Sequence, residues 1–154
     1  MLKAWVDSSF DEKLKIAGIG VVLQDGYNQQ VISNWIPCET NNYGELFAVF
    51  LATILTEGKA VIYTDSQCAI GYLNKWVKDK PRTEQQYFNH QRMRLLAYKI
   101  RMYNPEVQKI KAHTGQMKYL EVGNAMADLA SKQGRTKYYL KLNNINRRNF
   151  EHIR

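Results

Sequence analysis

The sequence has little of several features that mark special classes of protein. Only two cysteines occur, Cys38 and Cys68, too few for a disulfide framework or a four-cysteine zinc site, so we expect two reduced thiols. With 3 prolines and 9 glycines, the chain is not of a collagen-like or low-complexity type. The most apolar run, residues 46–55, is too short to span a bilayer, and the opening MLKAWVDS lacks the apolar segment of a signal peptide. We therefore expect a cytoplasmic protein without membrane association.

Acidic residues are also scarce relative to basic ones. The chain has 22 Lys and Arg against 14 Asp and Glu, a net charge of +8. This excess favours a polyanionic partner such as nucleic acid. Residues 135–154 hold six basic residues and only one acidic residue, for which a solvated tail is the alternative interpretation. We predict one domain over residues 1–134 and a basic C-terminal tail over 135–154.

Hydrophobic periodicity predicts an α/β protein with a mixed sheet. The expected elements are strands at 3–9, 15–24 and 31–36, a helix from about 40 to 58, a strand at 60–63, helices at 66–78 and 84–103, a strand at 107–111 and a helix at 123–133. Asp25-Gly26 is a hairpin signal between the second and third strands. In the last helix we expect an inner face of Val122, Met126, Leu129 and Ala130, and an end at Gly134. This order predicts three antiparallel strands followed by helix-connected strands, flanked by helices.

Four acidic residues stand where solvation alone would not place them. Asp7 lies within the first strand, and Asp65 follows the buried strand at 60–63, where open α/β sheets place their ligand sites. Glu45 and Asp128 border the apolar stripes of two helices. Carboxylates at the edge of a core are costly unless a cation neutralises them, and Mg²⁺ prefers carboxylate oxygens. For any one of these acids a cap or turn role is the alternative, and periodicity alone does not bring the four together.

Five short motifs occur in one order between residues 1 and 133. They are VDSS at 6–9, TNNYGELFA at 40–48, YTDSQ at 63–67, KAHTG at 111–115 and GNAMADLA at 123–130. Together they closely resemble the type 1 ribonuclease H family. The resemblance implies a ribonuclease H-like fold with a five-stranded mixed sheet, in which the four acids meet. It also implies an endonuclease that hydrolyses the RNA strand of RNA/DNA hybrids and leaves 5′-phosphate and 3′-hydroxyl ends.

The resemblance also assigns roles to individual residues. It implies that Asp7, Glu45, Asp65 and Asp128 bind two Mg²⁺ ions during catalysis, with Mn²⁺ as a substitute. Asp7 would bridge both ions, Asp128 would complete the site of the attacking water, and the other two would hold the ion near the leaving oxygen. His113 matches a loop histidine that assists proton transfer or product release. The unperturbed pKa of a histidine side chain, near 6.5, suits proton exchange at neutral pH, and a surface histidine without a role is the alternative.

Substrate contacts follow from the same resemblance. Asn41, Asn42 and Gln67 match positions that contact the hybrid, and amide groups suit the 2′-hydroxyls exposed in its minor groove. Thr40 matches a position that seats a DNA phosphate, and Trp76 matches a tryptophan near the substrate channel. For the two asparagines a helix N-cap is the alternative, which is compatible with substrate binding. No protein partner is evident, and we expect a monomer.

The sequence departs from the family pattern at several points. Ser8 replaces the glycine that usually follows the first aspartate, and the stretch from His113 to Asp128 is lengthened at about 117–122. Between residues 75 and 84 there is little room for the basic protrusion of some members, which bears on hybrid affinity rather than on chemistry. The tail from Arg135 onward matches nothing in the family pattern.

Two other functions fit the same fold. One is a non-catalytic nucleic-acid-binding module, which the presence of all four acids disfavours. The other is another nuclease of the ribonuclease H-like superfamily, such as a resolvase or transposase core, which the matches at Gln67 and Asn41-Asn42 disfavour. Cleavage of labelled hybrid, RNA duplex and DNA duplex distinguishes the three.

Overall fold

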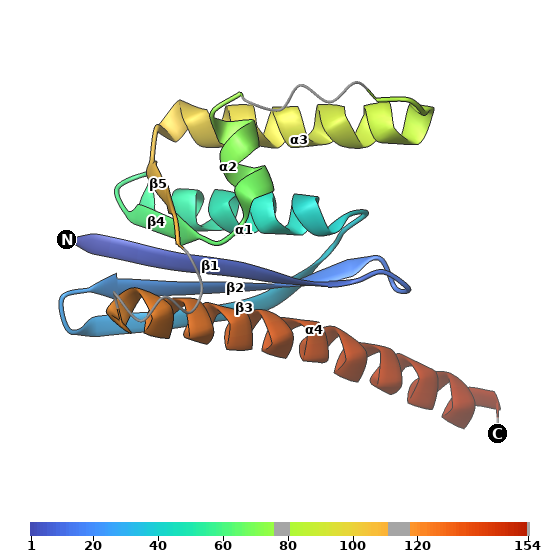
Figure 1. The fold of residues 1–154 in the computed structure, drawn as a ribbon. Coiled ribbons are helices and arrows are strands. Elements are labelled where there is room, and N and C mark those ends of the chain that lie inside the picture. The colour runs from blue at the N-terminus through green and yellow to red at the C-terminus, as the bar shows by residue number, and fades with distance from the viewer. Residues whose placement is uncertain (76–80, 111–117, 154) are drawn as a thin grey trace.

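The computed structural model describes residues 1–75, 81–110 and 118–153, with side chains as far as residue 148. Within these residues the predicted order of elements and the mixed α/β class are confirmed (Figure 1). The elements are β1 (Leu2–Asp11), β2 (Ile16–Asp25), β3 (Asn28–Pro37), α1 (Asn41–Thr56), β4 (Val61–Thr64), α2 (Gln67–Leu73), α3 (Glu84–Tyr103), β5 (Glu106–Lys109) and α4 (Lys118–Ile153).

The five strands form one sheet in the order β3-β2-β1-β4-β5. The first three strands are antiparallel, and their predicted hairpin turn is confirmed at Gly26, which has φ +61°. β4 pairs in parallel with β1 only as far as Trp5↔Tyr63, and β5 pairs in parallel with β4. β4 ends one residue later, at Thr64, so Asp7 lies beyond the stretch of β1 that pairs with β4, at a position that helices on both faces of the sheet can reach.

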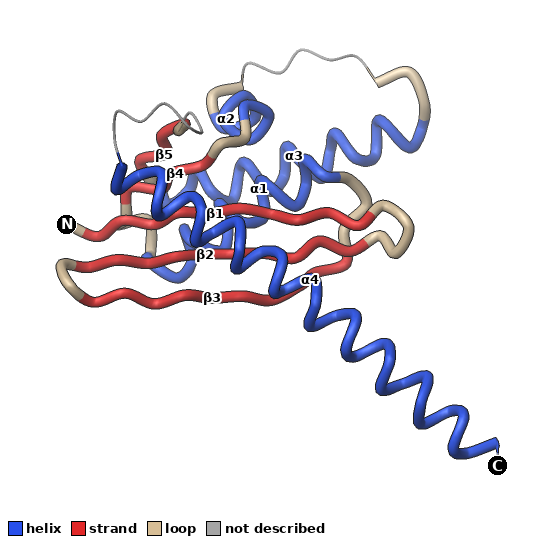
Figure 2. Tube along the Cα trace, turned by 60° about the horizontal axis from the view of Figure 1, so that its bottom comes forward, coloured by secondary structure: helices blue, strands red, loops and turns tan. Residues whose placement is uncertain are grey.

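Helices cover both faces of the sheet. α1, α2 and α3 lie on one side, and α4 lies alone across β1, β2 and β3 on the other (Figures 1 and 2). The larger core packs between the sheet and α1 and α3, and includes Val6, Ile19, Leu46 and Ile100. A smaller core under α4 is centred on Trp5, which stacks on Tyr63 with ring centroids 5.4 Å apart. Burial of each large apolar side chain stabilises the fold by about 1.5–3 kcal/mol.

The start of α2 agrees with the prediction from the sequence better than its end does. The predicted cap at Ser66 is confirmed, since its hydroxyl accepts from the Ala69 amide at 3.1 Å. α2 nevertheless ends at Leu73, so the prediction of a helix to residue 78 is wrong. The chain leaves the helical conformation there, and Lys75 adopts a left-handed φ of +58°.

The last helix differs most from the prediction. α4 does not end at Gly134 but runs without a break to Ile153, and it begins five residues earlier than expected. Of the predicted inner face, Ala130 is buried and Met126 is partly buried, but Val122 and Leu129 are each 58% exposed. Apart from Leu120 near its start, the buried side of its first half is made of small residues, namely Gly123, Ala127, Ala130, Ser131 and Gly134. The hydrophobicity pattern fails at Val122 and Leu129 because α4 packs so closely on the sheet that small side chains, whether apolar or polar, fit there better than large apolar ones.

The close contact of α4 depends on glycine in β2. A methyl group at Gly20 would overlap the backbone of Ala127 and Ser131. We expect Gly20→Ala to lower the free energy of unfolding by about 1–3 kcal/mol, because α4 would have to move away from the sheet. Urea denaturation measures this loss. Gly26→Asn is the control, since its turn is open and asparagine tolerates positive φ, and an equal loss in both variants would contradict the prediction.

Candidate active site

Three acidic side chains from three separate elements converge beside β1. Asp7 is on β1, Glu45 is near the start of α1, and Asp65 directly follows β4. One carboxylate oxygen from each lies within 4.8 Å of the others. Asp7 is buried, Glu45 is partly buried and Asp65 is exposed, so the cluster opens to solvent on the Asp65 side. The predicted convergence is therefore confirmed for these three residues.

Asp128, the fourth predicted acid, borders this cluster from α4. Its carboxyl is close enough to share a hydrogen bond with that of Asp7. Its Oδ2 atom is also 3.1 Å from the ammonium of Lys132, one helical turn along. The structure thus places all four acids in one region, with Asp128 held between the cluster and a basic side chain.

A second glycine explains how Glu45 reaches the cluster. A methyl group at Gly44 would overlap the hydroxyl oxygen of Ser8, so α1 packs closely on β1 at this point. Glu45 and Asp7 are the chain neighbours of these two residues and are brought together by the same contact. Ser8, the departure from the family pattern, is thus accommodated by Gly44, and its amide donates to Asp7 Oδ1 at 2.8 Å.

The cluster disfavours its own negative charge. Burial, with a smaller contribution from the charges of Asp65 and Asp128, raises the pKa of Asp7 from 3.8 to about 7. Burial and the charges of Asp7, Asp65 and Asp128 raise the pKa of Glu45 from 4.5 to about 9. Loss of water around the carboxylate also raises the pKa of Asp65. A positive charge among these oxygens would reverse the penalty.

The donor set fits a hard divalent cation. It consists of carboxylate oxygens, and Glu45 Oε2 is buried without a hydrogen-bond partner among the described residues. Mg²⁺ and Mn²⁺ prefer such oxygen ligands, and an orphaned buried carboxylate oxygen would be satisfied by coordination.

The ion pair between Lys132 and Asp128 makes a prediction about metal affinity. Both side chains are about half exposed, so the pair is worth at most about 1 kcal/mol. We expect Lys132→Gln to lower the Mg²⁺ concentration at half-saturation by up to about fivefold, because it frees Asp128 and removes a competing cation. Calorimetric titration without nucleic acid measures this, with Lys118→Gln on the same helix as control. Weaker Mg²⁺ binding by Lys132→Gln would contradict it.

The model of a family described as RNase H matches residues 2–136. The chain belongs to the RNase H family. The family and the fold support a nuclease that acts on RNA/DNA hybrids, and the acidic cluster lies within the matched region.

The solved structure of RNase H1 from the halophilic archaeon Halobacterium salinarum NRC-1 is similar to this RNase H in fold. The TM-score is 0.64 at 16% sequence identity, covering 88% of this chain and 98% of the archaeal chain. A search of curated proteins gave no match. The family match ends at residue 136, so the last part of α4 lies beyond it.

The predicted substrate-binding residues of this RNase H flank the acids. Thr40 is the N-cap of α1, and its hydroxyl accepts from the Tyr43 amide at 3.2 Å. The helix-cap alternative for Asn41 and Asn42 is therefore wrong: they are the first residues of α1, and both are exposed. Gln67 is exposed at the start of α2, two residues after Asp65. Their contacts with a hybrid stay predictions.

Two other predicted residues, His113 and Trp76, lie outside the described residues. Their predicted roles are untested. Sequence reasoning missed Lys132, although its spacing of four residues after Asp128 is the helical spacing for an ion pair. It also missed the packing role of Gly44, for which no sequence signal other than its adjacency to Glu45 exists.

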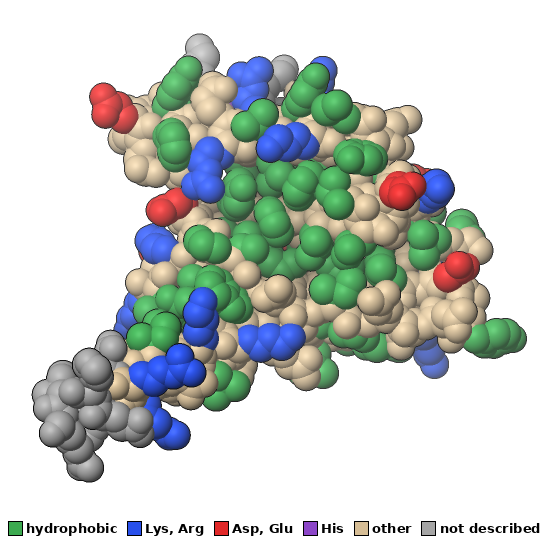
Figure 3. All heavy atoms as spheres, turned by 180° about the vertical axis from the view of Figure 1, so that it is seen from behind, with side chains coloured by type: hydrophobic (Ala, Val, Ile, Leu, Met, Phe, Trp, Pro, Cys, Tyr) green, Lys and Arg blue, Asp and Glu red, His purple; other side chains and the backbone are tan. Residues whose placement is uncertain are grey.

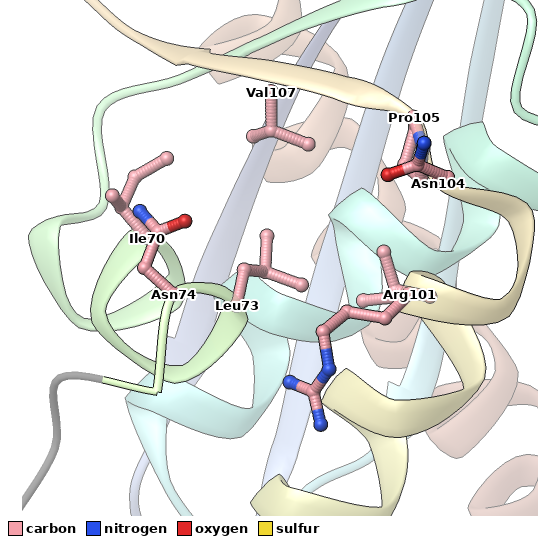
Figure 4. Close-up of a pocket in the computed structure, with 8 residues that line it drawn as sticks. Ile70, Leu73, Asn74, Arg101, Asn104, Pro105 and Val107 are labelled. Atoms are coloured by element: carbon pink, nitrogen blue, oxygen red, sulfur yellow. The ribbon is translucent and has the colours of Figure 1, made fainter.

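A small cavity lies apart from the acidic cluster, between α2, α3 and β5 (Figure 4). Its volume is about 170 Å³. The lining residues are Ile70, Leu73, Asn74, Ile100, Arg101, Asn104, Pro105 and Val107. Arg101 is its one charged residue and donates to the carbonyl of Tyr72 at 3.1 Å. The candidate active site is the acidic cluster, where the carboxylates converge.

No helix in the part of the chain that the structure describes combines the length and the apolar character needed to cross a bilayer.

Proposed function

We propose that this RNase H hydrolyses the RNA strand of RNA/DNA hybrids at the acidic cluster with two divalent metal ions. The observation that carries the proposal is the convergence of Asp7, Glu45 and Asp65, with Asp128 beside them, in a chain of the RNase H family. Mg²⁺ is the proposed ion, and Mn²⁺ the substitute, because every donor atom in the cluster is a carboxylate oxygen.

The four carboxylates would hold the ions, with Asp7 shared because it faces the other three. When bound, a pair of metal ions supplies Lewis-acid stabilisation of the attacking and leaving oxygens. Asp128, on the α4 side, would orient the attacking water, and Glu45 and Asp65 would lie on the leaving-group side. Attack at phosphorus breaks its bond to O3′ and leaves a 5′-phosphate and a 3′-hydroxyl.

The flanking amides would recognise the substrate. Asn41 and Asn42 lie four and three residues before Glu45, on the same side of α1, and Gln67 lies two residues after Asp65, at the start of α2. Amide groups both donate and accept, so they pair with 2′-hydroxyls in the wide minor groove without reading base sequence. This placement supports recognition of the RNA strand next to the ions.

A cleavage panel tests the proposal. Labelled hybrid, RNA duplex and DNA duplex of one sequence are incubated with Mg²⁺, with Mn²⁺ and with chelator. We expect cutting of the hybrid alone, only with metal, and products that carry 5′-phosphates. Equal cutting of all three duplexes, or undiminished cutting under chelator, would refute it. Binding of hybrid without cleavage in either metal would instead support a non-catalytic module.

A further inference from the structure

The last part of α4 projects beyond the sheet as a continuous helix (Figure 2). We name residues 135–148 the α4 extension. All but its first two residues lie beyond the family match, which ends at 136. The whole helix has 36 residues, which corresponds to a length of about 54 Å. The extension therefore carries side chains well away from the acidic cluster while remaining part of the helix that holds Asp128.

The root of the extension is fixed against the sheet. Lys137 Nζ donates to the Ser33 carbonyl at 2.6 Å, and the Tyr138 ring packs on Trp35 with centroids 4.6 Å apart. The hydroxyl of Tyr139 donates to Asp11 Oδ2 at 2.6 Å, a bond that lowers the pKa of the Asp11 carboxyl. These contacts join the helix to two different strands, β1 and β3, so the direction of the extension is set by the fold.

The extension and the turn before it are strongly and uniformly basic. Residues 132–148 contain six cations and no acid: Lys132, Arg135, Lys137, Lys141, Arg147 and Arg148. Of these six side chains, only Lys132 forms an ion pair within the part of the chain that the structure describes. Figure 3 shows Lys and Arg side chains along the projecting part of α4, with no Asp or Glu side chain among them on that face. Asp11 offsets part of the charge of Arg135 at the sheet, and no acidic residue accompanies Arg147 and Arg148 within residues 132–148.

The outer end of the extension is built of hydrogen-bond donors. After Lys141 the sequence reads LNNINRR, and residues 143–148 are all exposed. Asparagine is a weak helix former, and exposed residues gain little from packing, so neither helix propensity nor the core explains this composition. Arg and Asn side chains are typical contacts to phosphate and sugar oxygens. A membrane surface would require a broad apolar face, and the exposed large apolar residues here are only Leu140 and Ile145.

We propose that the α4 extension is a second contact surface for the phosphate backbone of a nucleic acid and lengthens the footprint on the substrate. This inference rests on the proposed function in one respect, namely that the nucleic acid is taken to be the RNA/DNA hybrid. Arg147 lies 19 residues after Asp128, about 28 Å along the helix axis. A duplex that is held at the acidic cluster and follows α4 would continue for most of a helical turn, about 34 Å, to meet Arg147 and Arg148.

Binding without metal tests this surface separately from cleavage. Affinity for hybrids of about 8 and about 24 base pairs is measured by fluorescence anisotropy in chelator over a range of KCl concentrations. The Arg147→Gln/Arg148→Gln variant leaves the anchoring contacts intact. For the long hybrid we expect it to reduce the slope of log affinity against log salt by about 1.8, since each lost phosphate contact contributes about 0.9. The short hybrid should bind both proteins equally.

Matched variants separate this role from general charge. Arg147→Lys/Arg148→Lys keeps both charges and should retain the slope, whereas Lys59→Gln/Lys99→Gln removes two charges elsewhere and should leave it unchanged. Equal slopes for wild type and the Arg147→Gln/Arg148→Gln variant, or no preference of wild type for the long hybrid, would overturn the proposal. If the Arg147→Gln/Arg148→Gln variant bound hybrids as well as wild type but lost binding to anionic lipid vesicles, the proposal would also be overturned, and the extension would be a membrane contact. Absence of cleavage in the duplex panel would refute the proposed function without affecting this result.

Discussion

Replacing Asp7 by asparagine is expected to abolish cleavage and to stabilise the protein at the same time. Asp7 is the buried centre of the acidic cluster, and loss of one metal ligand should cost several kcal/mol of transition-state stabilisation, or about a thousandfold in rate. In chelator at pH 8 the variant should unfold at a higher urea concentration, because asparagine removes a buried charge but still accepts from the Ser8 amide. The raised pKa of Asp7 sets an upper limit of about 4 kcal/mol on this gain.

Opposite changes in rate and stability exclude misfolding as the cause of inactivity. Asp25→Asn, in the exposed hairpin, is the control and should change neither quantity appreciably. Asp65→Asn should also lose activity, with a smaller gain in stability because Asp65 is exposed. Retained activity in either cluster variant would remove that residue from the ligand set. A loss of stability in Asp7→Asn would show that its charge is already compensated in the metal-free protein.

The stability of the metal-free protein is expected to fall as pH rises from about 4 to 9. The pKa of Asp7 is raised from 3.8 to about 7 and that of Glu45 from 4.5 to about 9 by folding. Between these limits the folded protein binds more protons than the unfolded chain. The stability that these two carboxyl groups contribute is therefore full below about pH 4 and is lost as the pH rises towards 9. The slope is about 1.4 kcal/mol per pH unit for each titrating group.

Urea denaturation in chelator from pH 4 to 9 measures this dependence. Glu45→Gln should flatten the decline between pH 7 and 9, whereas Glu39→Gln, exposed in the loop before α1, should leave it as in wild type. Saturating Mg²⁺ should restore stability most at high pH, where the cluster is ionised, by about 2.7 kcal/mol at 100 times the dissociation constant. A flat profile in chelator would contradict the prediction.

The sequence predicted the path of the chain well because local rules determine it. The hairpin at Gly26, the cap at Ser66 and the buried strand before Asp65 each follow from a few neighbouring residues. Convergence of the acids could not be obtained from periodicity, since it depends on the packing of elements far apart in sequence. It was predicted only through the motifs that resemble ribonuclease H.

The misjudged helix shows the limit of the same reasoning. Val122 and Leu129 were expected inside because they are apolar, yet they are exposed on α4. The distance between α4 and β2 determines which residues are buried there, because at Gly20 the helix lies so near the strand that only small residues fit between them. The continuation of α4 past Gly134 was missed because Gly134 packs on Asn34 of β3 rather than terminating the helix. Neither fact is visible without the partner strand.

The contact between Gly20 and α4 also fixes the rotational setting of that helix. Gly20 pairs directly with Asp7 in the sheet, and the backbone it contacts belongs to Ala127, the neighbour of Asp128. Slipping α4 by one residue would turn Asp128 by about 100° around the axis, away from Asp7. The position of Asp128 relative to Asp7 is thus set by a main-chain contact rather than by side-chain length. Transplanting this centre into another scaffold would require Gly20 together with the four carboxylates.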